Sequence, residues 1–354
     1  SHYLFNYEFG FVKRGLIGEI VRLIDSDFIR SYEFFFIFSS TILLINLVLL
    51  SVLLKHLFYK GDIALIGIGL CYASSVAIVF LVHTIGSFDH IGLMVVLAMI
   101  LVRENKQKFV IGVISLPIML LIHEALIVIF APLMVLIMFT SIKREKKLHF
   151  LILSSYILLI GVGTILVSES TISGDSAFIM QTQLENELGV KLRSDAFKVL
   201  QRSVRDNQGI MRTFMAVKQS QYLLVYSFVV TSPYLLLLWL WLFLHHRHNQ
   251  KMLLIKTLSF ACSFSPLLLL LVAYDVFRWF TLALTLSFLL ILYIINTEKD
   301  KVYGIKAHAG IIYGAIVVFF LNGISSIYLF DYIEIIDFPY FKHIRYLLEV
   351  ITGN

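Results

Sequence analysis

The sequence predicts an all-α membrane protein whose chain crosses the bilayer about ten times. Hydrophobic residues make up 59% of the 354 residues and charged residues 15%, against roughly 45–50% and about 25% in soluble domains. The mean hydropathy is +0.89, and the apolar residues form blocks longer than a buried strand. A soluble, disordered or disulfide-stapled chain is excluded, since there are only 5 prolines and 2 cysteines.

Ten apolar runs are candidate membrane helices, although some are shorter than the roughly 20 residues that a full span needs. These runs are residues 34–54, 63–82, 91–102, 109–122, 125–139, 150–167, 222–244, 253–273, 279–296 and 309–330.

Lysine and arginine gather in alternate short connections between these runs. Cytoplasmic connections carry an excess of these cations, so the cationic connections are expected inside and the others, whose single cation is Arg278, outside. The cationic connections contain Lys55 and Lys60; Arg103, Lys106 and Lys108; Lys143, Arg144, Lys146 and Lys147; Arg247 and Lys251; and Lys299, Lys301 and Lys306.

This topology predicts one membrane domain over residues 1–354. The chain starts at Ser1 without an initiating Met, so we also expect a segment upstream, including a first span. The predicted parts are an outer interfacial segment (1–33), a first helix group (34–167), an extracytoplasmic loop (168–221), a second helix group (222–330) and an outer C-terminal tail (331–354).

Short runs place ionisable residues inside the membrane. Run 91–102 has 12 residues, about 18 Å of helix against a hydrocarbon core of about 30 Å, so Asp89 and His90 are expected to be recessed. Runs 109–122 and 125–139 predict a hairpin with His123-Glu124 at its tip; the alternative is one long helix with this pair near its middle. Such residues are costly unless they face protein or a water-filled cavity, which predicts a cavity open to the outside.

An amphipathic helix is expected from Leu16 to Ile24, directly after Lys13-Arg14-Gly15. A helix N-terminus beside two cations suits a phosphate group. The alternative is that Lys13 and Arg14 only reach toward anionic headgroups.

Further cations are expected in the long outer loop. A helix capped by Ser194 or Asp195 would align Lys198, Arg202 and Arg205 in one stripe, which Arg212 extends toward the next span. The stripe suits a lid over a lipid-linked anionic substrate, or simple headgroup adhesion.

Asp275 and Arg278 are expected to pair at a helix start, either to hold Arg278 for phosphate or to join two spans.

The sequence contains no complete motif for a metal site or a nucleotide site. His123-Glu124 fails the zinc-protease pattern, because the fifth residue is Ile127. His83, Asp89 and His90 could bind a divalent metal but have no fixed ligand spacing, so no cofactor is predicted. The sequence also lacks a Gly-rich phosphate loop and a nucleophile elbow.

The arrangement of many spans, interfacial helices in a first outer loop and a large later outer loop resembles bacterial membrane glycosyltransferases of the GT-C type. It also resembles the related O-antigen and capsular polysaccharide polymerases (Wzy-like). Asn6-Tyr7-Glu8-Phe9-Gly10-Phe11-Val12-Lys13-Arg14-Gly15 is similar to a segment of membrane proteins from surface-polysaccharide loci.

The resemblance implies transfer of sugar or repeat units from a polyprenyl-phosphate or pyrophosphate carrier to an acceptor hydroxyl, at the outer face of a bacterial inner membrane. The implied partners are the lipid-linked glycan, membrane lipids and polysaccharide-assembly proteins, and not nucleic acid. Such enzymes place an acid early in the first outer loop, which is Glu8 or Glu19 here, and the polymerases use outer-loop arginines.

The candidate catalytic residues are therefore Glu124, His123, Asp89 and Glu8, and the candidate substrate-binding residues are Lys13, Arg14, His90, Arg202, Arg205, Arg212, Asp275 and Arg278. Two other classes stay open: a flippase for lipid-linked oligosaccharide or another secondary transporter, and a membrane acyltransferase using His123 or His90.

Overall fold

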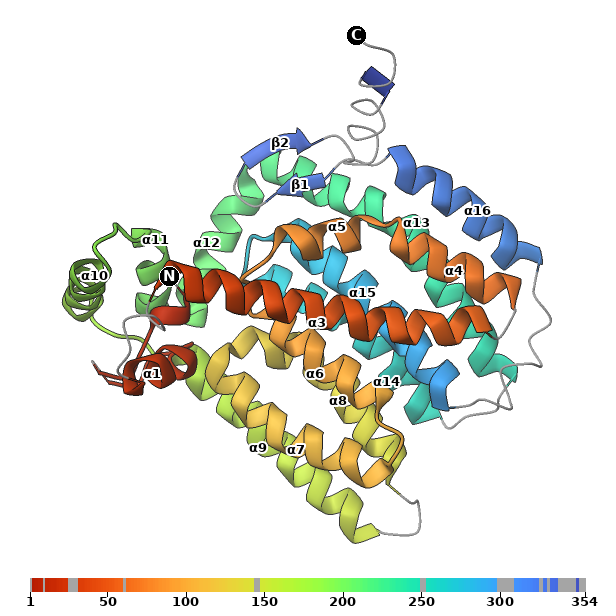
Figure 1. The fold of residues 1–354 in the computed structure, drawn as a ribbon, viewed down its shortest axis with the longest axis horizontal. Coiled ribbons are helices and arrows are strands. Elements are labelled where there is room, and N and C mark those ends of the chain that lie inside the picture. Colours follow the sequence, from red (N-terminus) through yellow and green to blue (C-terminus); the bar gives the residue numbers. More distant parts are fainter. Residues whose placement is uncertain are drawn as a thin grey trace. The chain divides into compact units, whose positions relative to one another are not determined.

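The structure is a computed structural model. It describes residues 2–8, 10–24, 31–59, 62–142, 147–248, 253–297, 309–324, 327–329, 332–336 and 348–349. Within these residues the regular elements are helices apart from one pair of short strands (Figure 1). Much of the predicted tail, residues 331–354, lies outside the described residues. So do several residues of the predicted cationic connections: Lys60, Lys143, Arg144, Lys146, Lys251, Lys299, Lys301 and Lys306.

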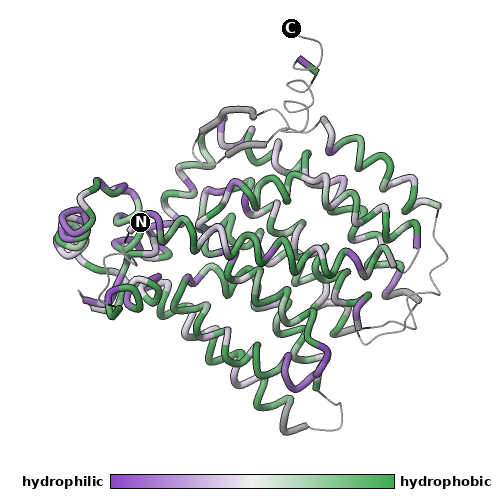
Figure 2. The backbone as a smooth tube through the Cα atoms, viewed as in Figure 1, coloured by the Kyte–Doolittle hydropathy of each residue, from purple (hydrophilic) through white to green (hydrophobic). Residues whose placement is uncertain are grey.

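In the described part of the chain, seven apolar stretches of helix are long enough to cross a membrane, and three shorter apolar helices accompany them. Each of the ten predicted runs overlaps one of these helices, and Figure 2 shows the apolar residues along them. The chain is a multi-pass helical membrane protein. The long stretches are Glu33–Lys55, Ile63–His83, Asn105–Ile122, Glu124–Ser141, Phe150–Glu169, Lys218–His245 and Val276–Thr297, and the short helices are Asp89–Leu101, Thr257–Leu271 and Ala309–Gly323.

Two predicted runs are not single regular helices. Run 63–82 is divided into α4 (Ile63–Ala73) and α5 (Val76–His83), because the backbone is extended at Ser75. Run 253–273 begins as α14 (Leu253–Phe264) and continues as the 3-10 helix η3 (Ser265–Leu271). Proline near the start of η3 removes a helical N–H donor.

The last run, 309–330, ends early. The helix α16 (Ala309–Ile324) stops before strand β1 (Ile327–Leu329), which pairs antiparallel with β2 (Tyr332–Ile336). The register shifts between Tyr328 and Leu329.

The chain divides into two compact units. The first comprises Ser1–Leu47 and Ile85–Arg212. Its helices include the 3-10 helix η1 (His2–Leu4), α1 (Leu16–Leu23), the start of α3 (Tyr32–Tyr59), α6 (Asp89–Leu101), α7 (Asn105–Ile122), α8 (Glu124–Ser141), α9 (Lys147–Glu169), α10 (Gly174–Leu188), α11 (Ser194–Lys198), the 3-10 helix η2 (Val199–Gln201) and most of α12 (Val204–Ala216).

Helix α8 forms the core of the first unit, where it packs against α6, α7 and α9 (Figure 1). Phe130 and Met134 of α8 are fully buried. A Cβ atom on Gly92 of α6 would lie 2.3 Å from the Phe130 ring, and one on Gly112 of α7 would lie 2.4 Å from the sulfur of Met138. These two glycines therefore allow the close approach that packs helices in a membrane.

A smaller core joins the N-terminal segment to α10 and α11. It contains Leu4, Phe5, Val12, Met180, Leu184, Ala196, Phe197 and Leu200. Helix α1 lies directly against this segment: a Cβ on Gly18 would lie 2.0 Å from the carbonyl oxygen of Phe5, and one on Gly15 would lie 2.4 Å from the Tyr7 ring. The N-terminal segment is thus held by apolar burial and by backbone contact with α1.

The second unit comprises Val48–Thr84 and Thr213–Asn354, so residues 48–84 of the predicted first helix group belong to it. Its core is α15 (Val276–Thr297), whose apolar window is 89% buried, and which packs on α5, α13 (Lys218–His248), α14 and η3. Buried polar bonds add to this packing: the Tyr234 hydroxyl donates to the Ile68 carbonyl at 2.7 Å, and the Asn322 amide donates to the Cys71 carbonyl at 2.9 Å.

We expect Gly92→Ala to lower the free energy of unfolding by about 1 to 3 kcal/mol, because the added methyl overpacks the α6–α8 contact. Gly161→Ala is the matched control, since a Cβ at that position meets nothing within 4 Å. Thermal unfolding of the purified protein in detergent measures both variants. Equal midpoints for the two would contradict the packing of α6 on α8.

Candidate functional site

The α7–α8 hairpin brings His123 and Glu124 to its tip. Helix α7 ends at Ile122, α8 begins at Glu124, and His123 between them has extended backbone angles of φ −167° and ψ 119°. The two helices pack against each other. The predicted hairpin is therefore confirmed, and the alternative of one continuous helix is wrong.

Glu124 forms an ion pair with Arg14, 110 residues earlier in the chain. Arg14 Nη2 lies 3.0 Å from Glu124 Oε1, and Arg14 Nε lies 3.5 Å from Oε2. The Nδ1 atom of His123 is 3.1 Å from the same Oε2. The Arg14 and Glu124 side chains are each only 15% exposed, so both carboxylate oxygens have a partner in a largely buried place.

His123 Nδ1 has two partners that need opposite protonation. It accepts from the Ala125 N–H at 3.1 Å, which requires an unprotonated nitrogen, and that bond caps the start of α8. It donates to Glu124 only when Nδ1 carries a proton. The imidazole therefore supports either the helix start or the carboxylate at any one time.

Lys13 is buried beside this ion pair. Lys13 is only 2% exposed, and its Nζ donates to the backbone carbonyl of Arg202. Burial lowers the pKa of Lys13, whereas the charges of Glu124, Glu169 and Asp206 act in the opposite direction. A second cation thus lies near the Glu124 carboxylate.

Arg14 adopts a left-handed backbone conformation, with φ of 68°. This region costs a non-glycine residue on the order of 1 kcal/mol and persists only where neighbouring contacts enforce it. Helix α1 begins at Leu16 after N-cap Gly15, as the sequence predicts. The two cations before it, however, turn to Glu124 and to the Arg202 carbonyl. We call Lys13, Arg14, His123 and Glu124 the ion-pair cluster.

Asp89 and His90 lie at the start of α6 and are almost fully buried, with exposed fractions of 1% and 2%. The Asn46 side-chain amide donates to the His90 carbonyl at 2.8 Å. Burial, with a smaller contribution from the charge of Asp89, raises the pKa of Tyr3 to about 12. The Phe88 ring makes edge contacts with both Tyr3 and His123, at 4.8 and 5.7 Å between centroids.

The predicted basic stripe over Lys198, Arg202 and Arg205 is wrong, because the helix is interrupted. Helix α11 gives way to η2, and the backbone is extended at Arg202. Helix α12 restarts at Val204: the Asp206 carboxylate accepts from the Ser203 N–H at 2.9 Å, and the Ser203 hydroxyl accepts from the Asp206 N–H at 3.2 Å. This is a capping box, so Ser203-x-x-Asp206 is the sequence signal that marks the break.

The predicted cap of α11 also differs. The N-cap is Arg193, and Ser194 and Asp195 are the first two helical residues. Arg202 is half-buried, whereas Lys198, Arg205 and Arg212 are exposed.

The remaining candidates lie elsewhere. Glu8 is exposed and accepts from Gln183 at 3.2 Å. Glu19 accepts from the Tyr7 N–H at 3.0 Å and from Arg22. Asp275 and Arg278 form the predicted pair at 3.1 Å, with the Arg278 guanidinium over the Trp279 ring, in the second unit.

The site residues that sequence reasoning missed are Glu169 and Asp206, whose charges act on Lys13. Across the described residues, no group of three or more His, Cys, Asp or Glu side chains could hold a metal ion. His83, Asp89 and His90 do not form such a group.

Comparison of the chain with protein-family models, with curated proteins and with solved structures finds no match in any of the three.

We expect Arg14→Gln and Glu124→Gln each to lower the free energy of unfolding by about 2 to 3 kcal/mol, because each leaves one partly buried charge without its partner. The double variant should lose less free energy of unfolding than the two single variants lose together, since it removes both charges. Thermal unfolding in detergent measures the cycle. Strictly additive losses would show that the two side chains do not interact.

Proposed function

We propose that this chain is a membrane glycosyltransferase that moves sugar or repeat units from a polyprenyl-phosphate or pyrophosphate carrier to an acceptor hydroxyl. The observation that carries the proposal is the ion-pair cluster, in which a carboxylate and two cations meet at the tip of an apolar helix hairpin. Ionisable residues next to membrane helices are costly and are typical of functional sites.

Glu124 is the proposed base. Its carboxylate takes the proton of the acceptor hydroxyl while the acceptor oxygen forms the new bond to the anomeric carbon. The bond from that carbon to the phosphate oxygen breaks, and its electron pair stays on the phosphate. Arg14 and Lys13 stabilise the charge that grows on this leaving group.

The Arg14 guanidinium can exchange the Glu124 carboxylate for a phosphate group of the donor. A guanidinium binds carboxylate and phosphate oxygens with the same paired geometry. A donor phosphate that enters beside Arg14 therefore competes with Glu124, and frees the carboxylate to receive a proton. His123, whose Nδ1 is 3.1 Å from Glu124 Oε2, holds the carboxylate in place meanwhile.

The cost of the cluster also supports a functional role. Lys13 is buried although burial disfavours its charge, and Arg14 is held at a positive φ. An apolar side chain in place of Lys13 and a glycine in place of Arg14 would avoid both costs. Local strain of this kind is typical of sites that are kept for function.

We place the cluster at the extracytoplasmic face of a bacterial inner membrane, in a GT-C-like protein. The exposed Arg205 and Arg212 then face lipid headgroups or the carrier, and assembly proteins act on the product.

Glu124→Gln should reduce transfer by about 10²- to 10⁴-fold, the usual contribution of a general base. Arg14→Lys should reduce transfer by about 10²-fold or more, because an ammonium group lacks the paired N–H donors of the guanidinium. The assay is transfer of radiolabelled sugar from a polyprenyl-phosphate donor by the full chain in lipid nanodiscs, at equal amounts of folded protein.

The matched controls are Asp195→Asn and Arg193→Lys. These residues form an ion pair of the same type at 2.6 Å, but their side chains are 57% and 73% exposed, so transfer should stay near that of the parent protein. The Arg14→Gln/Glu124→Gln double variant separates structure from chemistry, because it should regain stability without regaining transfer. Normal transfer by Glu124→Gln would exclude Glu124 as the base.

Orientation has its own test. Cysteine placed at Lys191, in the exposed loop after α10, should react with a membrane-impermeant maleimide on intact cells, whereas cysteine at Glu104 should react only after permeabilisation. Both positions are exposed, and the two natural cysteines are buried. The reverse labelling pattern would contradict an extracytoplasmic site.

A further inference from the structure

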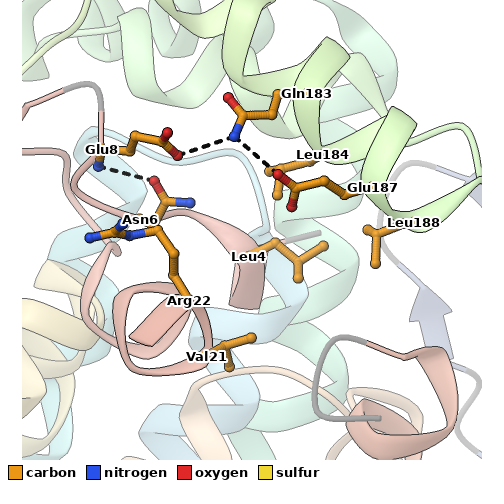
Figure 3. Close-up of a pocket in the computed structure, with 9 residues that line it drawn as sticks. All are labelled: Leu4, Asn6, Glu8, Val21, Arg22, Gln183, Leu184, Glu187 and Leu188. Carbon is orange, nitrogen blue, oxygen red and sulfur yellow. Dashed lines mark hydrogen bonds between the residues drawn. The ribbon is translucent and has the colours of Figure 1, made fainter. Parts of the chain in front are cut away.

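A cavity of about 300 Å³ lies in the first unit, apart from the ion-pair cluster. None of the four residues of that cluster is among its lining residues, and its volume is at the lower end of the range for small-molecule sites. Figure 3 shows the nine lining residues, which come from the N-terminal segment, α1 and α10: Leu4, Asn6, Glu8, Val21, Arg22, Gln183, Leu184, Glu187 and Leu188.

Two carboxylates are held at one side of this cavity by a shared amide. Gln183 Nε2 donates to Glu8 Oε2 at 3.2 Å and to Glu187 Oε1 at 3.0 Å (Figure 3). Each carboxylate keeps a second oxygen outside this bridge. The bridge thus fixes two hydrogen-bond acceptors whose residues lie 179 positions apart in the chain.

Asn6 adds a hydrogen-bond donor. Its residue is only 5% exposed, and its Oδ1 accepts from the Glu8 N–H at 3.1 Å, which fixes the orientation of the amide. The bond from the Glu8 N–H is made by Oδ1, and Figure 3 shows the Nδ2 group turned away from that bond, on the side of Leu4 and Leu184. This N–H₂ group can therefore donate to an acceptor on a ligand in the cavity.

Apolar side chains also line the cavity. They are Leu4, Val21, Leu184 and Leu188. Arg22 completes the lining, and its Nη2 lies 2.6 Å from Glu19 Oε1.

We propose that this cavity binds a saccharide. Sugar hydroxyls would donate to the free oxygens of Glu8 and Glu187, and a ring or hydroxyl oxygen would accept from Asn6 Nδ2. The C–H face of a pyranose ring would pack on the leucines.

Other ligand classes fit the cavity less well. An anion would meet two carboxylates. A divalent cation would meet an N–H donor, because the Gln183 amide lies between the carboxylates, whereas such cations take oxygen ligands. A neutral or amino sugar satisfies the donors, the acceptors and the apolar wall together.

Binding of a free sugar here needs neither a lipid-linked donor nor Glu124, so the inference does not rest on the proposed transfer reaction. It is tested on the full chain in nanodiscs by saturation-transfer NMR and titration. The probes are the methyl glycosides of glucose, galactose, mannose, rhamnose, N-acetylglucosamine and glucosamine. At least one should bind in a saturable manner.

Two nearly isosteric variants test the geometry. Asn6→Asp keeps an oxygen to accept from the Glu8 N–H but removes the N–H₂ donor, and Glu187→Gln keeps an oxygen for the Gln183 bridge but removes the charge. Each should weaken sugar binding by about tenfold or more, because a site loses affinity when a hydrogen bond to a sugar hydroxyl is lost.

Asp175→Asn is the matched control, since Asp175 is an exposed residue of the same helix outside the cavity. Sugar binding by the parent protein is measured without any transfer reaction, which distinguishes failure of this inference from failure of the transfer proposal. The inference is overturned if no glycoside binds, if Asn6→Asp and Glu187→Gln bind like the parent protein, or if calcium or a simple ammonium ion binds in place of sugars.

Discussion

The ion pair between Arg14 and Glu124 connects the N-terminal segment to the tip of the α7–α8 hairpin, and the neighbouring groups depend on it. Each side chain is 15% exposed, so neither charge is stable there without the other. The pair determines where the left-handed turn at Arg14 lies, and Lys13 follows it into a buried place beside the Arg202 carbonyl. His123 Nδ1 contacts the same carboxylate at 3.1 Å. This contact thus lies among groups from the N-terminal turn, the helix hairpin and the end of η2.

The two proposed sites divide the chemistry between them and share the N-terminal segment. The ion-pair cluster concentrates formal charge, which suits phosphate and proton transfer. The cavity at Asn6, Glu8, Gln183 and Glu187 offers acceptors, an amide donor and apolar side chains, which suits hydroxyl groups. Residues 2–14 contribute to both, held by the small core with α10 and α11 and by contact with α1. Any change that displaces this segment should therefore act on both sites together.

The spans, the hairpin tip and the start of α1 were predictable because their signals are local: hydropathy, a polar pair between two apolar runs, and glycine before an amphipathic stretch. The basic stripe was predicted wrongly because helical spacing was extended through Arg202, although Ser203 and Asp206 form a capping box that starts a new helix. The partners of Glu124, Lys13 and Glu8 were not predictable. Arg14 is 110 residues from Glu124, and Lys13 is 189 residues from Arg202. Contacts at such separations have no periodic signature in a single sequence.

Among the described glycines, Gly18 leaves the least room for a side chain. Position 18 lies against a main-chain carbonyl, with 2.0 Å left for a Cβ atom, and position 15 lies against the Tyr7 ring, with 2.4 Å left. A main-chain carbonyl oxygen is present whatever residue occupies position 5. A substitution there therefore makes no room for a larger residue at position 18. Proteins that build the same contact between α1 and the N-terminal segment are therefore expected to keep a glycine at the position of Gly18, whatever the sequence of their membrane helices.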